Sequence, residues 1–314
     1  MTQSPDFLLH SRPDVPDLSV SRGVTPFYLP NLPVRGRLVR LGPLADALLT
    51  RHDHPAPVRA LLGQALALVA GLATALKFSG SFSLQAKGDG AVPLLLADCT
   101  DTGALRGYAR VAEDQEMPDS HASRALMGDG YLALTVDQGP DMERHQGIVA
   151  LEGDSLADMA LHYFSTSEQL PCAIYLASGQ TEHGWRAAAL IVERIAGPSG
   201  VDPSLSEAEQ DEAWRTATIL AATITEAELL DDSLPAERVL YRLFHGEGVA
   251  ADRPRPLAYG CRCSRARLAE LLSGFAPDDL NHMAIEGTIT MTCEFCNFDF
   301  CFPHALEPTA KEPS

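Results

Sequence analysis

The sequence predicts an α+β protein with a mixed N-terminal core domain, a helical linker and a small C-terminal cysteine module. Short segments of alternating apolar and polar residues, separated by turns, predict strands in the first half of the chain. A long, almost wholly apolar segment predicts a buried helix among them. Two closely spaced cysteine pairs near the C-terminus set the last part apart. With 314 residues, of which 46% are hydrophobic, the chain is long enough for a domain and an appendage.

We expect four parts: a flexible N-terminal extension at 1–31, the core at 32–197, a metastable helical linker at 198–256 and the cysteine module at 257–314. In the core, Val58–Phe78 carries apolar residues at helical spacing and on nearly every face, which predicts a deeply buried helix. Leu156–Ser165 also fits a helix, and Ala187–Ile195 fits either a helix or a strand. The expected core strands are Arg37–Leu41, Ser81–Lys87, Val92–Ala97, Leu105–Val111, Tyr131–Val136, Gly147–Leu151 and Cys172–Leu176.

The linker begins where Pro198-Ser199-Gly200 interrupts the pattern. Ser206 and Glu209 have capping-box spacing and predict a helix that reaches about Leu230, and Pro235 predicts a second helix through Phe244. Few large aliphatic residues occupy the first turns. We therefore expect a marginally stable segment docked on the core, without a core of its own.

The cysteine module has few residues to bury, so it needs a metal or another crosslink. Thr288–Thr292 and Asn297–Phe302 predict two strands, with Cys293 and Cys296 at the turn between them. Cys261 and Cys263 form a C-x-C pair upstream. Four thiols in two such pairs fit a tetrahedral zinc site. Their spacing leaves open whether zinc is a permanent crosslink or whether the thiols also switch by forming disulfides.

A thioredoxin-like role for the C-x-x-C pair is disfavoured, because the residues that follow it are a poor first turn of a helix. We expect Cys301 to face inward beside Phe300 and Phe302, the alternative being a competing ligand. Four thiolates already complete a zinc shell. His282 and His304 are therefore expected on the surface. Cys99 and Cys172 lie at expected strand positions and are expected to pack as small hydrophobes.

Other motifs give no support for an enzyme. No phosphate-binding loop of the G-x-x-x-x-G-K or G-x-G-x-x-G type is present. Gly88-Asp89-Gly90 and Gly128-Asp129-Gly130 fit ordinary turns. His52-Asp53-His54-Pro55 resembles a metal or acid/base cluster but better fits the connection into the long helix, and no nucleophile motif occurs.

Composition restricts the partners. A net charge of −18 and a pI of about 4.8 disfavour nucleic acid and anionic membranes. The longest uncharged apolar segment, Ala65–Leu76, is shorter than the roughly 20 residues that a membrane-spanning helix needs. The first 20 residues lack the apolar centre of a secretory signal. We therefore expect a cytoplasmic protein with free or metal-bound thiols.

The order and separation of the cysteine pairs resemble those of the heat shock protein 33 family. The similarity extends from about Leu32 to Phe302 and includes segments well outside the cysteines. Among them are Val34-Arg-Gly-Arg-Leu, His52-Asp-His-Pro-Ala-Pro-Val, Gln85-Ala-Lys-Gly-Asp-Gly, Leu151-Glu-Gly-Asp-Ser-Leu and Ser167-Glu-Gln-Leu-Pro. Cys301 and the long N-terminal extension depart from the family pattern.

The resemblance implies a redox-regulated, ATP-independent holdase chaperone and not an enzyme. In the reduced, inactive state, one zinc ion would be bound by Cys261, Cys263, Cys293 and Cys296. Oxidation would form Cys261–Cys263 and Cys293–Cys296 disulfides, release zinc, unfold the redox-switch module and the linker, and give a homodimer that binds unfolding proteins. Structural zinc contributes about 10–16 kcal/mol to such modules, and disulfides across one or two residues restrict the chain little. A constitutive zinc-ribbon binding module and a thiol oxidoreductase are the alternatives.

Overall fold

The structure is a computed structural model, described for residues 16–75, 79–120, 122–139, 142, 144–195 and 206–303. It forms two compact units, which divide between Gly260 and Cys261. The first, Asp17–Gly260, is here called the sheet unit and contains both the expected core and the expected linker. The second, here called the cysteine unit, is described over residues 261–303. Residues 1–15 of the predicted N-terminal extension lie outside the described residues.

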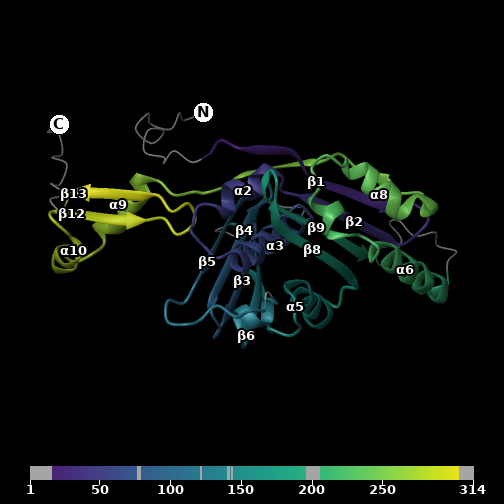
Figure 1. The fold of residues 1–314 in the computed structure, drawn as a ribbon, viewed down its shortest axis with the longest axis horizontal. Helices are drawn as coiled ribbons and strands as arrows, with labels where there is room; N and C mark the ends of the chain where they lie inside the picture. The colour runs from purple at the N-terminus through teal and green to yellow at the C-terminus, as the bar shows by residue number, and fades with distance from the viewer. Residues whose placement is uncertain are drawn as a thin grey trace. The chain divides into compact units, whose positions relative to one another are not determined.

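Eleven strands of the described chain form one sheet in the order β7-β6-β3-β4-β5-β11-β1-β2-β9-β8, with β10 paired to β1 (Figure 1). Neighbours are antiparallel except β11 and β5. The strands are β1 (Ser19–Leu29), β2 (Val34–Arg40), β3 (Ser81–Gly88), β4 (Leu94–Thr100), β5 (Ala104–Arg110), β6 (Gly130–Asp137), β7 (His145–Ala150), β8 (Cys172–Thr181), β9 (Gly184–Arg194), β10 (Ala250–Ala251) and β11 (Arg255–Tyr259).

All seven expected core strands are present, with ends that differ by a few residues. The ambiguous segment Ala187–Ile195 lies largely in strand β9, where its alanines fit between neighbouring elements on both faces. The expectation of a loose extension through residue 31 is wrong for β1, which pairs with β2 and β11 inside the sheet. Pro26 within β1 interrupts the usual strand signal, because proline cannot donate to the ladder.

Helix α3 (Ala56–Ala73) is the buried centre of the sheet unit and confirms the helix predicted over Val58–Phe78, although residues 76–78 are outside the described chain. It contacts strands of both halves of the sheet. Glycine allows it to approach the sheet closely: a Cβ at Gly63 would lie 2.1 Å from Ser178 Oγ, and one at Gly71 would lie 2.6 Å from Ile191 Cδ1. Among described helices, α3 alone is long and apolar enough to span a membrane, but it is mostly buried, as a core helix would be.

Shorter helices and turns complete the core. They are α2 (Pro43–Leu49), α4 (Ser123–Met127) and α5 (Leu156–Tyr163), which continues into a π-helix, η1 (Phe164–Glu168). The two Gly-Asp-Gly turns are joined to each other. The Asp89 amide donates to the Asp129 carbonyl at 3.0 Å, and the Asp129 amide donates to the Asp89 carboxylate at 2.7 Å. Their role as turns is therefore confirmed.

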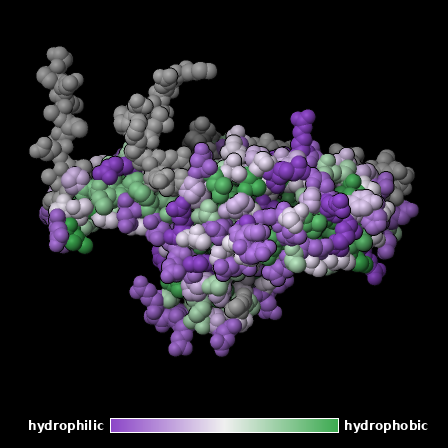
Figure 2. All heavy atoms as spheres, turned by 45° about the horizontal axis from the view of Figure 1, so that its top comes forward, coloured by the Kyte–Doolittle hydropathy of each residue, from purple (hydrophilic) through white to green (hydrophobic). Residues whose placement is uncertain are grey.

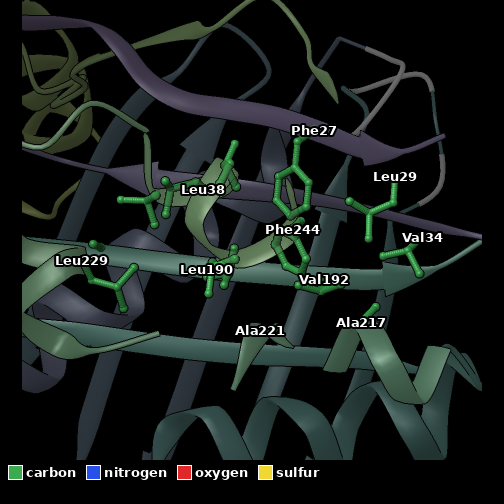
Figure 3. Close-up of a cluster of buried hydrophobic side chains, with 14 of the residues drawn as sticks. Phe27, Leu29, Val34, Leu38, Leu190, Val192, Ala217, Ala221, Leu229 and Phe244 are labelled. Carbon is green, nitrogen blue, oxygen red and sulfur yellow. The ribbon is translucent and has the colours of Figure 1, made fainter. Parts of the chain in front are cut away.

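The linker helices cover one face of β1, β2 and β9 (Figure 3). They are α6 (Glu207–Ala221), α7 (Glu226–Leu230) and α8 (Ala236–Phe244), followed by a 3-10 turn, η2 (His245–Glu247). The single helix expected from Ser206 to Leu230 is wrong, because Thr225 and Glu228 form a second capping box that starts α7. In Figure 1, α6 and α8 lie beside the end of the sheet that contains β1, β2, β8 and β9.

The cysteine unit contains two helices and one hairpin among its described residues. They are α9 (Arg265–Ser273), α10 (Pro277–Met283), β12 (Thr288–Thr292) and β13 (Asp299–Pro303). The hairpin confirms both expected strands. Its buried apolar core consists of Leu272, Ile289, Phe300 and Phe302. The expected scarcity of core residues is therefore present in the structure, whereas α10 has no buried residue at all.

Candidate metal centre

Four cysteine sulfurs meet in the cysteine unit. The Sγ atoms of Cys261, Cys263, Cys293 and Cys296 all lie within 4.8 Å of one another. Cys261 Sγ is 3.4 Å from Cys263 Sγ and 3.6 Å from Cys293 Sγ, and Cys263 Sγ is 3.5 Å from Cys296 Sγ. These separations are far longer than the roughly 2.05 Å of a disulfide bond, so the four residues are thiols here.

The arrangement fits a metal ion bound by four thiolates. Sulfurs placed tetrahedrally about 2.3 Å from one zinc ion lie about 3.8 Å from each other. The three separations given above are within a few tenths of an ångström of that value, and all six are at most 4.8 Å. Among the described residues, this is the one group of three or more histidine, cysteine or acidic side chains that could hold a metal ion.

Local structure explains how each pair is positioned. Cys263 directly precedes Ser264, whose hydroxyl caps α9 by accepting from the Arg267 amide at 3.3 Å. The other pair lies in the connection between β12 and β13, where the Cys293 amide donates to the Phe298 carbonyl at 3.0 Å. Asn297 adopts a left-handed backbone conformation, φ 54°, and its amide donates to the Cys293 carbonyl. This tight turn brings Cys293 and Cys296 to the same side.

The thiols share protons with one another. Hydrogen bonds from Cys261 and Cys296 hold the pKa of Cys293 far below its usual range. Burial raises the pKa of Cys263 to about 12, and hydrogen bonds with Cys261 and Cys293 raise the pKa of Cys296. Ionisation of all four sulfurs at these separations requires a cation among them.

Cys301 does not belong to this cluster. The expectation that it faces inward is wrong: it is exposed on β13, opposite Thr290, while Phe300 and Phe302 on either side are buried. Alternation along a strand forces this outcome, since two inward neighbours leave the middle side chain outward. His282 is exposed as expected, and His304 lies outside the described residues.

The other singled-out residues take structural positions. His52 and His54 stack at 5.1 Å in the connection to α3, which confirms their place before the helix. Cys99 is buried in β4, and Cys172 is half-buried in β8, where burial and Glu193 raise its pKa to about 12. Sequence patterns did not indicate Arg265, whose guanidinium lies 4.6 Å from the Phe302 ring and donates to the Cys301 carbonyl at 2.6 Å.

The fold and the site define an α+β protein that carries a small four-cysteine unit able to hold a metal ion. The sequence profile described as Hsp33 protein matches residues 23–303. The chain is 39% identical to a 33 kDa chaperonin of Caulobacter vibrioides (strain NA1000 / CB15N) over 284 residues, which cover 87% of this chain and 92% of that protein. It is also 39% identical to a 33 kDa chaperonin of Pseudomonas aeruginosa (strain UCBPP-PA14) over 278 residues, 88% and 90% of the two chains.

A solved structure shares the fold. The crystal structure of a 33 kDa chaperonin, a heat shock protein 33 homolog from Thermotoga maritima, aligns with a TM-score of 0.74 and 22% identity, covering 90% of this chain and 95% of that chain. From the profile and the relatives, this chain belongs to the Hsp33 protein family.

Proposed function

We propose that this chain is a redox-regulated, ATP-independent holdase chaperone, inactive when Cys261, Cys263, Cys293 and Cys296 bind one zinc ion. The observation that carries the proposal is the meeting of these four sulfurs in a unit with only four fully buried apolar side chains among its described residues. Membership of the Hsp33 protein family, whose curated relatives are named chaperonins, supports it.

When bound, zinc would supply a tetrahedral crosslink between distant parts of the unit. One cysteine pair precedes α9, and the other lies between β12 and β13. Two molecules of hydrogen peroxide, with four protons, would take four electrons from the four thiolates and become four molecules of water. The bonds formed would be Cys261–Cys263 and Cys293–Cys296. Both are local, so neither replaces the crosslink between the pairs, and such short loops restrict the unfolded chain little.

Loss of that crosslink would unfold the cysteine unit, and the linker would then leave the sheet. The uncovered apolar surface would bind unfolding client proteins and allow homodimers to form. Reduced thiols suit the cytoplasm, and the net charge of −18 disfavours nucleic acid and anionic membranes as partners. The position of the C-x-x-C pair in a hairpin, and not at a helix start, disfavours a thioredoxin-like oxidoreductase.

The test measures zinc release and the aggregation of a thermally unfolding client protein, with and without hydrogen peroxide. We expect the oxidised protein to release one zinc ion per chain and to suppress light scattering, and the reduced protein to do neither. Cys296→Ser should fail to hold zinc, whereas the matched variant Cys301→Ser should behave like the unaltered protein. The proposal fails if oxidised, zinc-free protein suppresses aggregation no better than the reduced form.

A further inference from the structure

The sheet face beneath the linker is apolar at its centre and positively charged at its rim. Along β9, alternate residues face the linker: Ala188, Leu190 and Val192 belong to the apolar cluster, and an arginine stands at each end. Arg186 pairs with Asp232 of the linker, and Arg194 pairs with Asp211 at 2.6 Å. The strand therefore presents an apolar stripe between two cations.

The neighbouring strands repeat this arrangement. Arg22 on β1 pairs with Glu237 on α8, and Arg40 at the end of β2 donates to the carbonyls of Leu234 and Glu228. Burial lowers the pKa of Arg40, while Asp232 and Asp231 oppose that shift. We call Arg22, Arg40, Arg186 and Arg194 the arginine rim. Each of the four is joined to an acidic side chain or to carbonyls of the linker.

The linker matches this surface in its apolar side chains and in its charge. Helix α8 buries Val239, Leu240, Leu243 and Phe244, and the Phe244 ring stacks on Phe27 at 5.4 Å (Figure 3). Asp211, Asp232 and Glu237 flank these apolar contacts and meet the rim. The linker is thus an apolar helical segment with acidic flanks, seated on an apolar surface that is bordered by opposite charge.

We propose that this face, once the linker leaves it, selects client segments that combine an apolar helical face with flanking Asp or Glu residues. The inference rests on the proposed function and names the class of client. Departure of the linker removes the acidic partners of Arg22, Arg186 and Arg194 and the two carbonyl acceptors of Arg40. With the linker docked, 8% of the Arg186 side chain is exposed. A client that covers this face buries the cations again, so an acidic client restores the lost pairs, whereas a lysine-rich client leaves the buried cations without acidic partners.

The positive charge of the arginine rim is opposite in sign to the net charge of the whole chain. A net charge of −18 favours cationic partners at long range. In the face shown in Figure 2, hydrophilic residues predominate and hydrophobic ones form small separate areas, so that face presents mainly polar surface while the linker is docked. A preference for acidic segments would consequently identify the uncovered sheet face, and not the general surface, as the place where clients bind.

The experiment uses the oxidised full-length protein and three fluorescent helical peptides with the same apolar residues and with Glu, Gln or Lys at the flanking positions. Anisotropy at low salt should give affinities in the order Glu, Gln, Lys, with the Glu peptide about five- to ten-fold tighter than the Gln peptide, since each half-exposed charge pair contributes a small factor. The difference should shrink in 0.5 M NaCl, which screens exposed charges.

The double variant R22Q/R194Q should lose most of the preference for the Glu peptide. The matched control R144Q, which removes an exposed arginine paired with Asp137 away from the linker, should keep it. Equal binding of the Glu and Lys peptides, or an unchanged preference in R22Q/R194Q, would overturn the inference. If the oxidised protein shows either of these results but still prevents a client from aggregating, the inference fails and the proposed function stands. If it binds the Glu peptide selectively but does not prevent aggregation, the proposed function fails and the binding preference stands.

Discussion

The sheet unit and the cysteine unit achieve stability in different ways. The sheet unit surrounds α3 with strands of both halves of the sheet and buries most of that helix. Among its described residues, the cysteine unit has a buried apolar core of only Leu272, Ile289, Phe300 and Phe302 around a hairpin, and four sulfurs that could hold a metal ion lie together in the same unit. Hydrophobic burial does not respond to oxidants, whereas thiolate ligation does. Under the proposed function, this difference would let the sheet unit stay folded while the cysteine unit responds to oxidants.

Metal removal should produce the largest difference in stability between the two units. In reducing buffer with a chelator, we expect the cysteine unit to unfold and the sheet unit to remain, because structural zinc contributes about 10–16 kcal/mol and whole domains are stable by about 5–15 kcal/mol. Hydrogen exchange measures this: the amides of Ile289 and Phe302 should lose protection, while those of Leu66 and Leu84 keep it. Equal loss of protection in both units would refute the separation.

Phe244→Ala tests whether hydrophobic burial stabilises the docked linker, as it stabilises the rest of the sheet unit. Phe244 is fully buried and stacks on Phe27, so truncation should cost about 3–5 kcal/mol of docking free energy. We expect lower hydrogen-exchange protection in α6 to α8, and client holding at lower peroxide concentration, with zinc content unchanged. Tyr241→Ala is the matched control, since Tyr241 lies on the same helix with 65% exposure. If both variants have equal effects, burial of Phe244 is not what holds the linker on the sheet.

The smallest expected effect is a pH dependence confined to the sheet unit. Burial, with His52 and Arg59 nearby, lowers the pKa of His54 to about 4. The unfolded pKa is about 6.5, so the unfolded chain gains a proton first, and stability present above pH 6.5 is lost as the pH falls toward 4. At this half-buried position we expect about 1–2 kcal/mol after solvent screening.

Denaturant titrations of the sheet unit between pH 7 and pH 5 measure that change. His54→Gln should flatten the dependence, because glutamine does not titrate. The exposed His183 provides a matched control, and His183→Gln should retain the slope. A slope that is identical in both variants would assign the pH dependence to other groups.

Much of the sheet was predictable because its strands alternate regularly between turn signals. Ser81–Gly88, for example, shows strict alternation of burial along β3. The strands that were missed depend on distant partners. β1 contains Pro26, and β11 pairs with both β1 and β5, so each is a strand only because the sheet supplies its neighbours.

The candidate metal centre was predictable residue by residue, since ligand spacing is local within each cysteine pair. The outward orientation of Cys301 was also predictable, because alternation along a strand points it away from the side on which the apolar Phe300 and Phe302 are buried. The arginine rim, by contrast, was not predictable. Its members are far apart in the sequence, and none stands in a motif.

The sequence by itself determined the cysteine pairs, the buried helix and the scarcity of core residues around the thiols, because each depends on neighbours along the chain. Tertiary structure alone decided that β1 is an inner strand and that four arginines border the face under the linker. These features depend on strand register and on which faces meet, and a linear pattern does not specify either when the contacting residues are far apart in the sequence, as Arg35 and Glu193 or Arg22 and Glu237 are.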